Sequence, residues 1–180
     1  YRNNLSTSGR YPRLLFIAHR IEILEQSMRT FRAVLRDGSF GELLGGLYEP
    51  RNWTHVFATI QSLSRNIDRI GHDQFDVVII DEFHHAEAAS YRKVINALKP
   101  SELLGLTATP ERADGVDVTN FFGNRTAASI RLWDALETDL LCPFHYFGIS
   151  DNTDLSALKW TRGKYDENAL SDYYTNNDAR

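Results

Sequence analysis

The sequence predicts an α/β protein built on a parallel β-sheet that helices cover on both faces. Short apolar runs typical of strands alternate with segments whose apolar residues repeat at helical spacing. One run, Val77–Ile80, holds four consecutive β-branched apolar residues, which favours a strand buried on both faces, as in a parallel sheet. The alternation continues through most of the 180 residues, a length that suffices for one good core.

The first hundred residues give the clearest elements. The helix over 21–35 ends at Asp37-Gly38, a typical stop signal. A helix from about 88 to 98 ends at Pro100, which cannot continue it. Residues 38–52 are rich in glycine and are predicted as a loop. The predicted strands cover 14–18, 55–58, 76–80 and 103–107, and the predicted helices cover 21–35, 59–63 and 88–98.

The pattern changes toward the end of the chain. We expect a loop over 113–124, a short strand over 127–130 and a helix near 132–140, after which Cys142-Pro143 interrupts the alternation. The run 144–149 has the character of a strand, residues 151–164 are loop-like, and Asp166 is a candidate cap for a helix through Tyr174. We therefore predict one domain over 1–142, followed by a linker and the start of a second domain over 143–180.

Composition excludes several classes of protein. No segment reaches the roughly 18 continuous apolar residues of a membrane span, and no apolar leader opens the chain. The single cysteine, Cys142, excludes an internal disulfide and fits a reducing, cytoplasmic compartment. The net charge of −4 argues against a dedicated basic nucleic-acid module, although not against a local basic path. Both ends read as if cut from a longer polypeptide.

Asp81 and Glu82 directly follow the apolar run 77–80 and are the main candidates for chemistry. In open parallel sheets, ligands bind beyond the carboxyl ends of the strands. An acidic pair there can hold Mg²⁺ through one member and handle a water molecule with the other, which is the chemistry of a nucleoside-triphosphate motor. Two alternatives are a plain solvated strand end and a transition-metal site formed with His84 and His85.

Four blocks then occur in a fixed order: Phe16-Ile-Ala-His-Arg20 with Gln26, Ala58-Thr-Ile-Gln-Ser-Leu63, Asp81-Glu-Phe-His84, and Leu106-Thr-Ala-Thr-Pro-Glu-Arg112. They resemble motifs Ia, Ib, II and III in the first motor domain of superfamily 2 helicases. The resemblance covers roughly residues 12–150 and is nearest to the motor subunit of type III restriction enzymes and to bacterial helicases with an added phospholipase-D-like nuclease domain. It implies a three-layer α/β/α RecA-like fold of the P-loop NTPase type.

The resemblance also implies roles at the nucleotide. Asp81 would hold, through water, the Mg²⁺ that bridges the β- and γ-phosphates. Glu82 would orient and deprotonate the attacking water. His84 would lie near the γ-phosphate and report its state, and the hydroxyls of Thr107 and Thr109 would link the nucleotide site to the nucleic-acid path.

A second set of residues would face nucleic acid. Contacts to the sugar-phosphate backbone suit a motor that must not prefer any sequence. Arg112 would contact either nucleic acid or the partner domain. The residues that would face the backbone are His19, Arg20, Thr59, Gln61 and Ser62.

One departure from the family pattern matters. The family binds phosphate with Gly-x-x-x-x-Gly-Lys-Ser/Thr, and this sequence has no such loop, since its only Gly-Lys pair is Gly163-Lys164, followed by Tyr165. The loop would lie upstream of Tyr1. ATP and Mg²⁺ would then serve the full-length protein, while the fragment alone would neither bind ATP tightly nor hydrolyse it. The sheet would lack the phosphate-loop strand, so the strand 103–107 would have an open edge. Such an edge favours self-association of the chain, or the pairing of another segment in place of the missing strand.

These expectations describe a fragment of an ATP-dependent DNA helicase or translocase, in restriction or repair, that works with a second motor domain of the same polypeptide and not at a membrane. A non-catalytic scaffold or interaction domain that keeps the fold without the chemistry is the first alternative. An RNA motor is the second, because contacts to the backbone do not distinguish DNA from RNA.

Overall fold

Parallel strands form the centre of the first part of the chain. The computed structural model describes residues 11–86, 88–109, 118–148, 155–161 and 164–177. The chain divides into two units, Tyr1–Ser129 and Ile130–Arg180, and each is described by itself.

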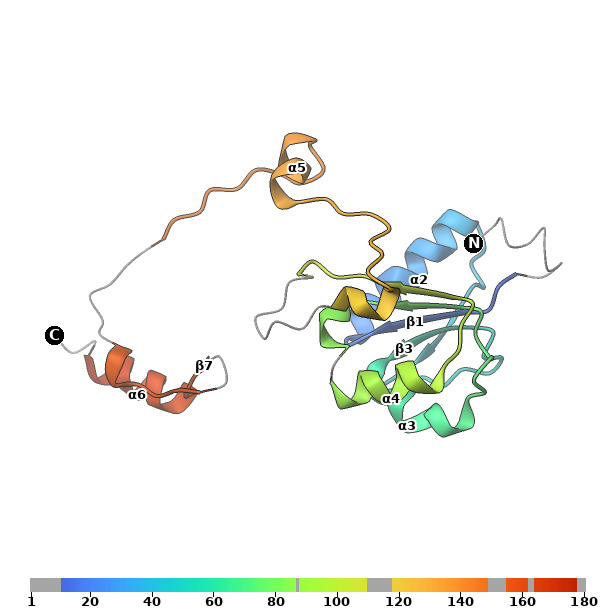
Figure 1. Ribbon diagram of the computed structural model, residues 1–180, viewed down its shortest axis with the longest axis horizontal. Coiled ribbons are helices and arrows are strands. Elements are labelled where there is room, and N and C mark those ends of the chain that lie inside the picture. Colours follow the sequence, from blue (N-terminus) through green and yellow to red (C-terminus); the bar gives the residue numbers. More distant parts are fainter. Residues whose placement is uncertain (1–10, 87, 110–117, 149–154, 162–163, 178–180) are drawn as a thin grey trace. The chain divides into compact units, whose positions relative to one another are not determined.

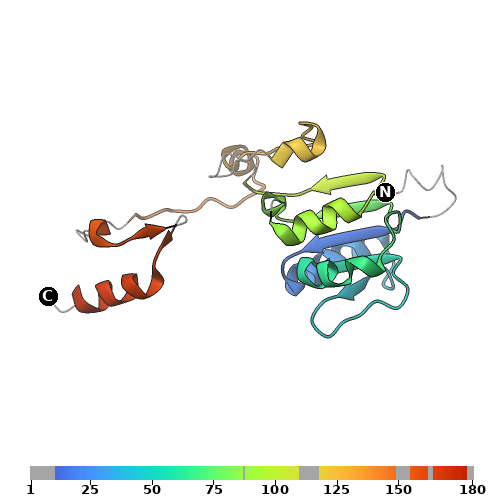
Figure 2. The same cartoon turned by 60° about the horizontal axis from the view of Figure 1, so that its bottom comes forward.

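The sheet of the first unit has five strands in the order β2-β3-β1-β4-β5, all parallel. In the register, Ala18 lies opposite Thr59 and Ile17 lies opposite Ile80. The carboxyl ends of the strands therefore meet at one edge of the sheet (Figure 2). The strands are β1 (Leu14–Ala18), β2 (Glu42–Leu44), β3 (His55–Thr59), β4 (Val77–Ile80) and β5 (Glu102–Gly105).

Helices cover both faces of this sheet, which gives the three layers of a RecA-like fold. Helix α2 (Ile21–Leu35) lies on one face, while α3 (Ile60–Asn66) and α4 (Ala89–Ala97) lie on the other (Figure 1). α2 ends at Arg36, which adopts a left-handed conformation with φ of 56°. Thr59 caps α3, because its hydroxyl accepts a hydrogen bond from the Ser62 amide at 3.3 Å. Short 3₁₀ turns occur at η2 (Ile67–Arg69), η3 (Phe83–His85) and η4 (Val118–Phe122).

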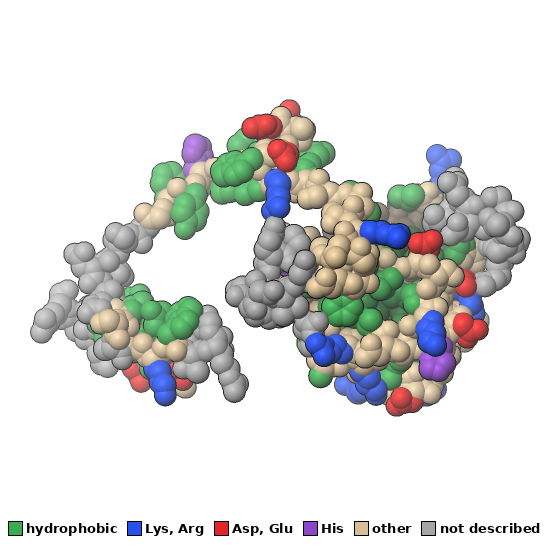
Figure 3. All heavy atoms as spheres, viewed as in Figure 1, with side chains coloured by type: hydrophobic (Ala, Val, Ile, Leu, Met, Phe, Trp, Pro, Cys, Tyr) green, Lys and Arg blue, Asp and Glu red, His purple; other side chains and the backbone are tan. Residues whose placement is uncertain are grey.

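Alternate residues of the strands enter two separate cores. The core beneath α3 and α4 includes Val78 and Ile80, each 1% exposed. The core beneath α2 includes Leu24 and Phe57, with Val77 and Ile79 only partly buried at its border. The strand expected to be buried on both faces is therefore fully buried on one face and half-buried on the other. In the space-filling view, apolar side chains gather at the centre of the visible face of this unit, with charges of both signs around them (Figure 3).

The structure corrects several expectations about single elements. Residues 38–52 include a three-residue strand, β2, where only a loop was expected. Within the expected loop 113–124, residues 118–122 form η4, and 113–117 lie outside the described residues. Residues 127–130, all described, contain no strand, and neither do 144–148, whereas 149 is not described.

The second unit holds smaller elements: α5 (Leu132–Glu137), η5 (Leu155–Ala157), the antiparallel pair β6 (Trp160–Thr161) and β7 (Lys164–Tyr165), and α6 (Glu167–Asn177). The pair begins within the segment 151–164 that was expected to be loop-like, and it ends at Tyr165 just beyond that segment. Asp166 caps α6, since its Oδ1 atom accepts a hydrogen bond from the Ala169 amide at 2.9 Å. The domain boundary at 142/143 stays a prediction. Among the described residues, no helix has the length and hydropathy needed to cross a membrane.

Candidate functional site

The acidic pair lies at the carboxyl edge of the sheet, where β4 ends. The Asp81 amide extends the ladder by donating to the Ile17 carbonyl at 2.8 Å, and both carboxylate residues are half-buried. Glu82 adopts the left-handed conformation, with φ of 52° and ψ of 48°. This conformation costs a residue with a side chain about 1–3 kcal/mol, and such strain is concentrated at functional sites.

His84 connects the end of β4 to the end of β5. Beyond the two strands, the Leu106 amide donates to the Ile80 carbonyl at 2.9 Å and the Phe83 amide donates to the Leu106 carbonyl at 2.8 Å. This backbone pairing places Thr107 next to His84. The Nδ1 atom of His84 lies 3.1 Å from the Thr107 hydroxyl and 3.2 Å from Glu82 Oε2.

The contacts continue one step further along motif III. The Thr107 hydroxyl accepts a hydrogen bond from the Thr109 amide at 3.1 Å. Glu82, His84, Thr107 and Thr109 therefore form one unbroken chain of polar contacts between two neighbouring strand ends. The sequence predicted these four residues, and the structure brings them together.

Phe83 anchors the turn that carries these residues. It is 1% exposed, and its ring packs against Phe122 with centroids 4.7 Å apart and against Phe121 at 5.4 Å. Gly105 of β5 passes so close that a Cβ atom there would lie 2.7 Å from Phe83 Cγ. The side chains of Glu82 and His84 therefore project from a backbone that is fixed by a buried aromatic cluster.

The predicted nucleic-acid residues lie at the same edge, beyond β1 and β3. His19 is half-buried and Arg20 is exposed at the start of α2. Gln61 is exposed on α3, next to Thr59, whose hydroxyl caps that helix. Ser62 is only 6% exposed and its hydroxyl accepts a hydrogen bond from Arg65 at 3.1 Å, so among the members of the set that the structure describes it is the buried one. Arg112 lies outside the described residues.

The donor set at the edge fits Mg²⁺. This ion is usually held by one or two carboxylates together with waters and substrate phosphates, not by a cage of protein ligands. Asp81 and Glu82 supply two adjacent carboxylates, and within the described ranges no group of three or more His, Cys, Asp or Glu side chains is placed to hold a metal. That arrangement suits Mg²⁺ with a phosphate better than it suits a structural zinc ion.

Comparison with known proteins identifies the family. The sequence model of the type III restriction enzyme res subunit (ResIII) matches residues 2–112. This chain belongs to the ResIII family. It is 28% identical over 103 residues to the type I restriction enzyme EcoAI endonuclease subunit of Escherichia coli, a match over 56% of this chain and 13% of that protein. It is 24% identical over 164 residues to the putative ATP-dependent helicase IRC3 of Saccharomyces cerevisiae, over 87% of this chain and 24% of that protein.

Solved structures share the fold of the ResIII chain. The Hef helicase domain of Pyrococcus furiosus aligns with a TM-score of 0.52 and 23% identity, over 68% of this chain and 29% of that one. The type ISP restriction-modification enzyme LlaGI, solved with a DNA substrate mimic, aligns with a TM-score of 0.51 and 18% identity, over 77% of this chain and 17% of that one. The ResIII chain thus has the fold of a helicase motor domain and spans less than a third of the length of each of these four proteins.

Sequence reasoning missed two residues beside the candidate site. Gly105 matters because Phe83 and Phe122 approach it, and neither is near it in sequence. Tyr91 of α4 is 4% exposed and packs against His85, with ring centroids 6.3 Å apart. The only signal for Tyr91 was an aromatic residue shortly after the acidic pair, and that spacing is equally typical of ordinary core.

Proposed function

We propose that this chain is part of the first motor domain of an ATP-dependent DNA helicase or translocase that serves restriction or repair. The observation that carries the proposal is the chain of contacts from Glu82 through His84 to Thr107, at the carboxyl edge of a parallel sheet. Membership of the ResIII family and the name of the IRC3 relative support it. The domain boundary at 142/143 belongs to the same proposal.

The proposed hydrolytic roles follow from position. Glu82 accepts the proton of the attacking water, and its half-buried carboxylate beside His84 has a fixed orientation for that task. Asp81 would hold Mg²⁺ through water, and the ion would supply positive charge to the phosphates. His84 contacts both the Glu82 carboxylate and the Thr107 hydroxyl, so a movement of Glu82 displaces His84 and, through it, Thr107. The hydrogen bond from the Thr109 amide to the Thr107 hydroxyl extends this displacement to Thr109.

The proposed nucleic-acid contacts lie along the same edge. Arg20 and Gln61 are exposed and meet the sugar-phosphate backbone directly, with His19 and Thr59 beside them. Ser62 supports this surface from inside by holding Arg65. Arg112 contacts nucleic acid or the second motor domain. DNA is favoured over RNA because LlaGI was solved with a DNA substrate mimic.

The left-handed conformation of Glu82 favours a motor over a non-catalytic scaffold. A scaffold has no need to keep a glutamate in a strained backbone conformation beside a histidine and a threonine, because Asn or Gly would adopt the same backbone conformation at lower cost. A scaffold would also not need the Glu82–His84 contact of 3.2 Å.

The test is Glu82→Gln in the full-length protein. We expect nucleotide binding to persist, while DNA-stimulated phosphate release falls by about 10²–10⁴-fold, the usual contribution of a general base. Glu22→Gln on the exposed surface of α2 is the matched control and should turn over normally. Near-normal turnover of Glu82→Gln would remove the general-base assignment.

Two further parts of the proposal concern the 180-residue chain alone. Without a Gly-x-x-x-x-Gly-Lys-Ser/Thr loop in its sequence, it neither binds ATP tightly nor hydrolyses it, so DNA-stimulated phosphate release from the purified chain would contradict us. β5 is an edge strand, and Leu104 and Leu106 are 40% and 39% exposed, so the chain self-associates through this edge. A monomer by light scattering at high concentration would count against that association.

A further inference from the structure

Tyr91 carries a hydroxyl that the roles proposed above do not use. The residue lies near the start of α4 and is 4% exposed. Within the part of the chain that the structure describes, this hydroxyl has no hydrogen-bond partner. A buried hydroxyl without a partner lowers stability and is rare in folded proteins, so it requires an explanation.

The surroundings of the hydroxyl point to the acidic pair. The Tyr91 ring packs against His85, and His85 packs against His84 with ring centroids 4.1 Å apart. Burial raises the pKa of Tyr91, and the negative charges of Asp81 and Glu82 raise it further. The phenol ring is therefore linked through His85 and His84 to the Glu82 carboxylate.

Packing alone does not account for the oxygen. Tyr91 belongs to the apolar core beneath α3 and α4, together with Phe83, Ala86 and Val94. A phenylalanine would fill nearly the same space there without burying an unpaired polar atom. The hydroxyl is the part of the side chain that the core does not need.

We propose that the Tyr91 hydroxyl is a positioning group for Asp81, to whose carboxylate it donates a hydrogen bond across one water molecule. The inference rests on the proposed function, which gives Asp81 the task of holding Mg²⁺. Asp81 is chosen over Glu82 because the Glu82 carboxylate already contacts His84 at 3.2 Å. Residues that orient a metal-binding side chain typically contribute about 10–100-fold in metal affinity or activity.

The test compares Tyr91→Phe with the wild type in the full-length protein. The first measurement is the Mg²⁺ concentration that gives half-maximal binding of a fluorescent, non-hydrolysable ATP analogue. We expect this concentration to rise about tenfold or more in Tyr91→Phe, with the binding reached at saturating Mg²⁺ unchanged. The second measurement is the melting temperature without nucleotide or Mg²⁺, which should stay the same or rise because the unpaired hydroxyl is gone.

Tyr48→Phe is the matched control, because Tyr48 is 53% exposed at a turn of the same unit. It should change neither measurement. An unchanged Mg²⁺ dependence in Tyr91→Phe overturns the inference, and so does a lower melting temperature with weaker binding at saturating Mg²⁺, which would mark a packing role. If the wild-type protein shows no Mg²⁺-dependent nucleotide binding at all, the proposed function fails and this inference fails with it.

Discussion

Gly105→Ala is expected to destabilise the first unit, because β5 passes the buried Phe83 at very close range. A Cβ atom at position 105 would lie 2.7 Å from Phe83 Cγ and 2.7 Å from Phe122 Cζ, whereas ordinary contact begins at 3.4 Å. Overpacking of this kind costs about 1–3 kcal/mol. The replacement of glycine gains about 0.4–1 kcal/mol by restricting the unfolded chain. The net loss is then about 1–2 kcal/mol, or roughly 3–10 °C in melting temperature for a unit of this size.

The effect should reach the chemistry as well. Phe83 lies between Glu82 and His84 and packs against Phe121 and Phe122, so a methyl group that displaces its ring should also displace the turn. Differential scanning fluorimetry and DNA-stimulated phosphate release of the full-length variant measure the two consequences. Gly38→Ala is the control, since no atom lies within 4 Å of its added Cβ. If Gly105→Ala matches the wild type in both assays, the close approach does not constrain the turn and the reasoning is wrong.

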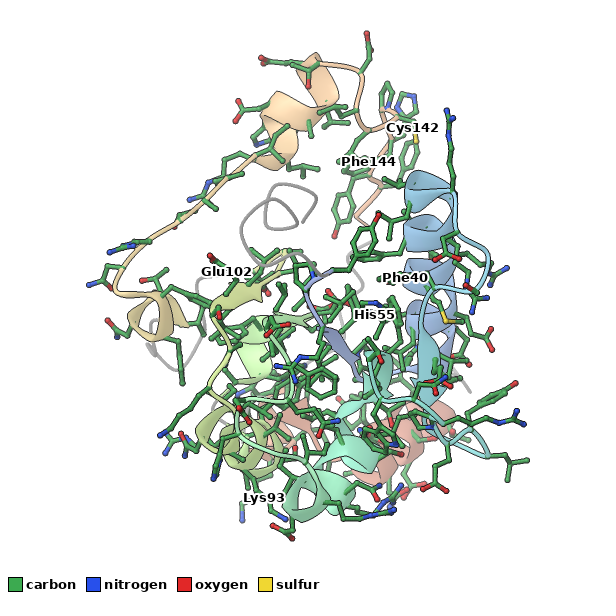
Figure 4. All side chains as sticks on the ribbon, turned by 90° about the vertical axis from the view of Figure 1, so that its right-hand side faces the viewer. Phe40, His55, Lys93, Glu102, Cys142 and Phe144 are labelled. Carbon is green, nitrogen blue, oxygen red and sulfur yellow. The ribbon has the colours of Figure 1, made fainter. Side chains whose placement is uncertain are left out.

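Two further predictions concern the opposite side of the sheet and its loops. Burial tends to raise the pKa of Glu42, but hydrogen bonds from the amides of residues 51–53 outweigh it and lower the pKa below 4.5. Glu42→Gln should therefore speed amide hydrogen exchange at 51–53 near neutral pH. The difference in unfolding free energy between the variant and the wild type should shrink as the pH falls below 4.5 and through the lower folded-state pKa, and a difference independent of pH would contradict this. Burial lowers the pKa of His55, which stacks on Phe40 with ring centroids 4.3 Å apart beside α2 (Figure 4), and Asp37 opposes this shift. As the pH drops below 6.5 the unfolded chain takes up a proton at His55 before the folded chain does, so the unfolding free energy should fall. In a series of chemical denaturations at different pH, His55→Gln should reduce this slope of unfolding free energy against pH, and an unchanged slope would refute the prediction.

Strong local patterns are what made the fold predictable. The apolar run 14–18 and the helical spacing over 21–35 coincide with β1 and α2, because each pattern matches the period of its element and is followed by a clear stop. The position of Asp81 at the carboxyl edge of the sheet was also predictable, because it directly follows its strand and parallel strands end together. The strand β2 was not predictable, since three residues between glycines carry almost no periodic signal.

Contacts between distant parts of the chain account for the rest. Gly105 and Phe83 are separated by a helix and a strand, and Phe122 reaches them from a segment that looked like a loop. The surroundings of Tyr91 depend on how α4 packs under the sheet, which spacing along the sequence does not describe. The left-handed conformation of Glu82 gives no signal in the sequence either, because glutamate rarely adopts it.

The pairing of α3 with α4 has a mechanical consequence. Lys93 of α4 (labelled in Figure 4) donates a hydrogen bond to the Ser64 carbonyl of α3 at 3.0 Å, and Leu63 and Val94 share one apolar core, so the two helices pack together as a block. One helix of that block carries Gln61 and the other carries Tyr91. Contacts between α4 and α3 therefore connect the surroundings of Tyr91 to the helix that carries Gln61 without passing through His84 and Thr107.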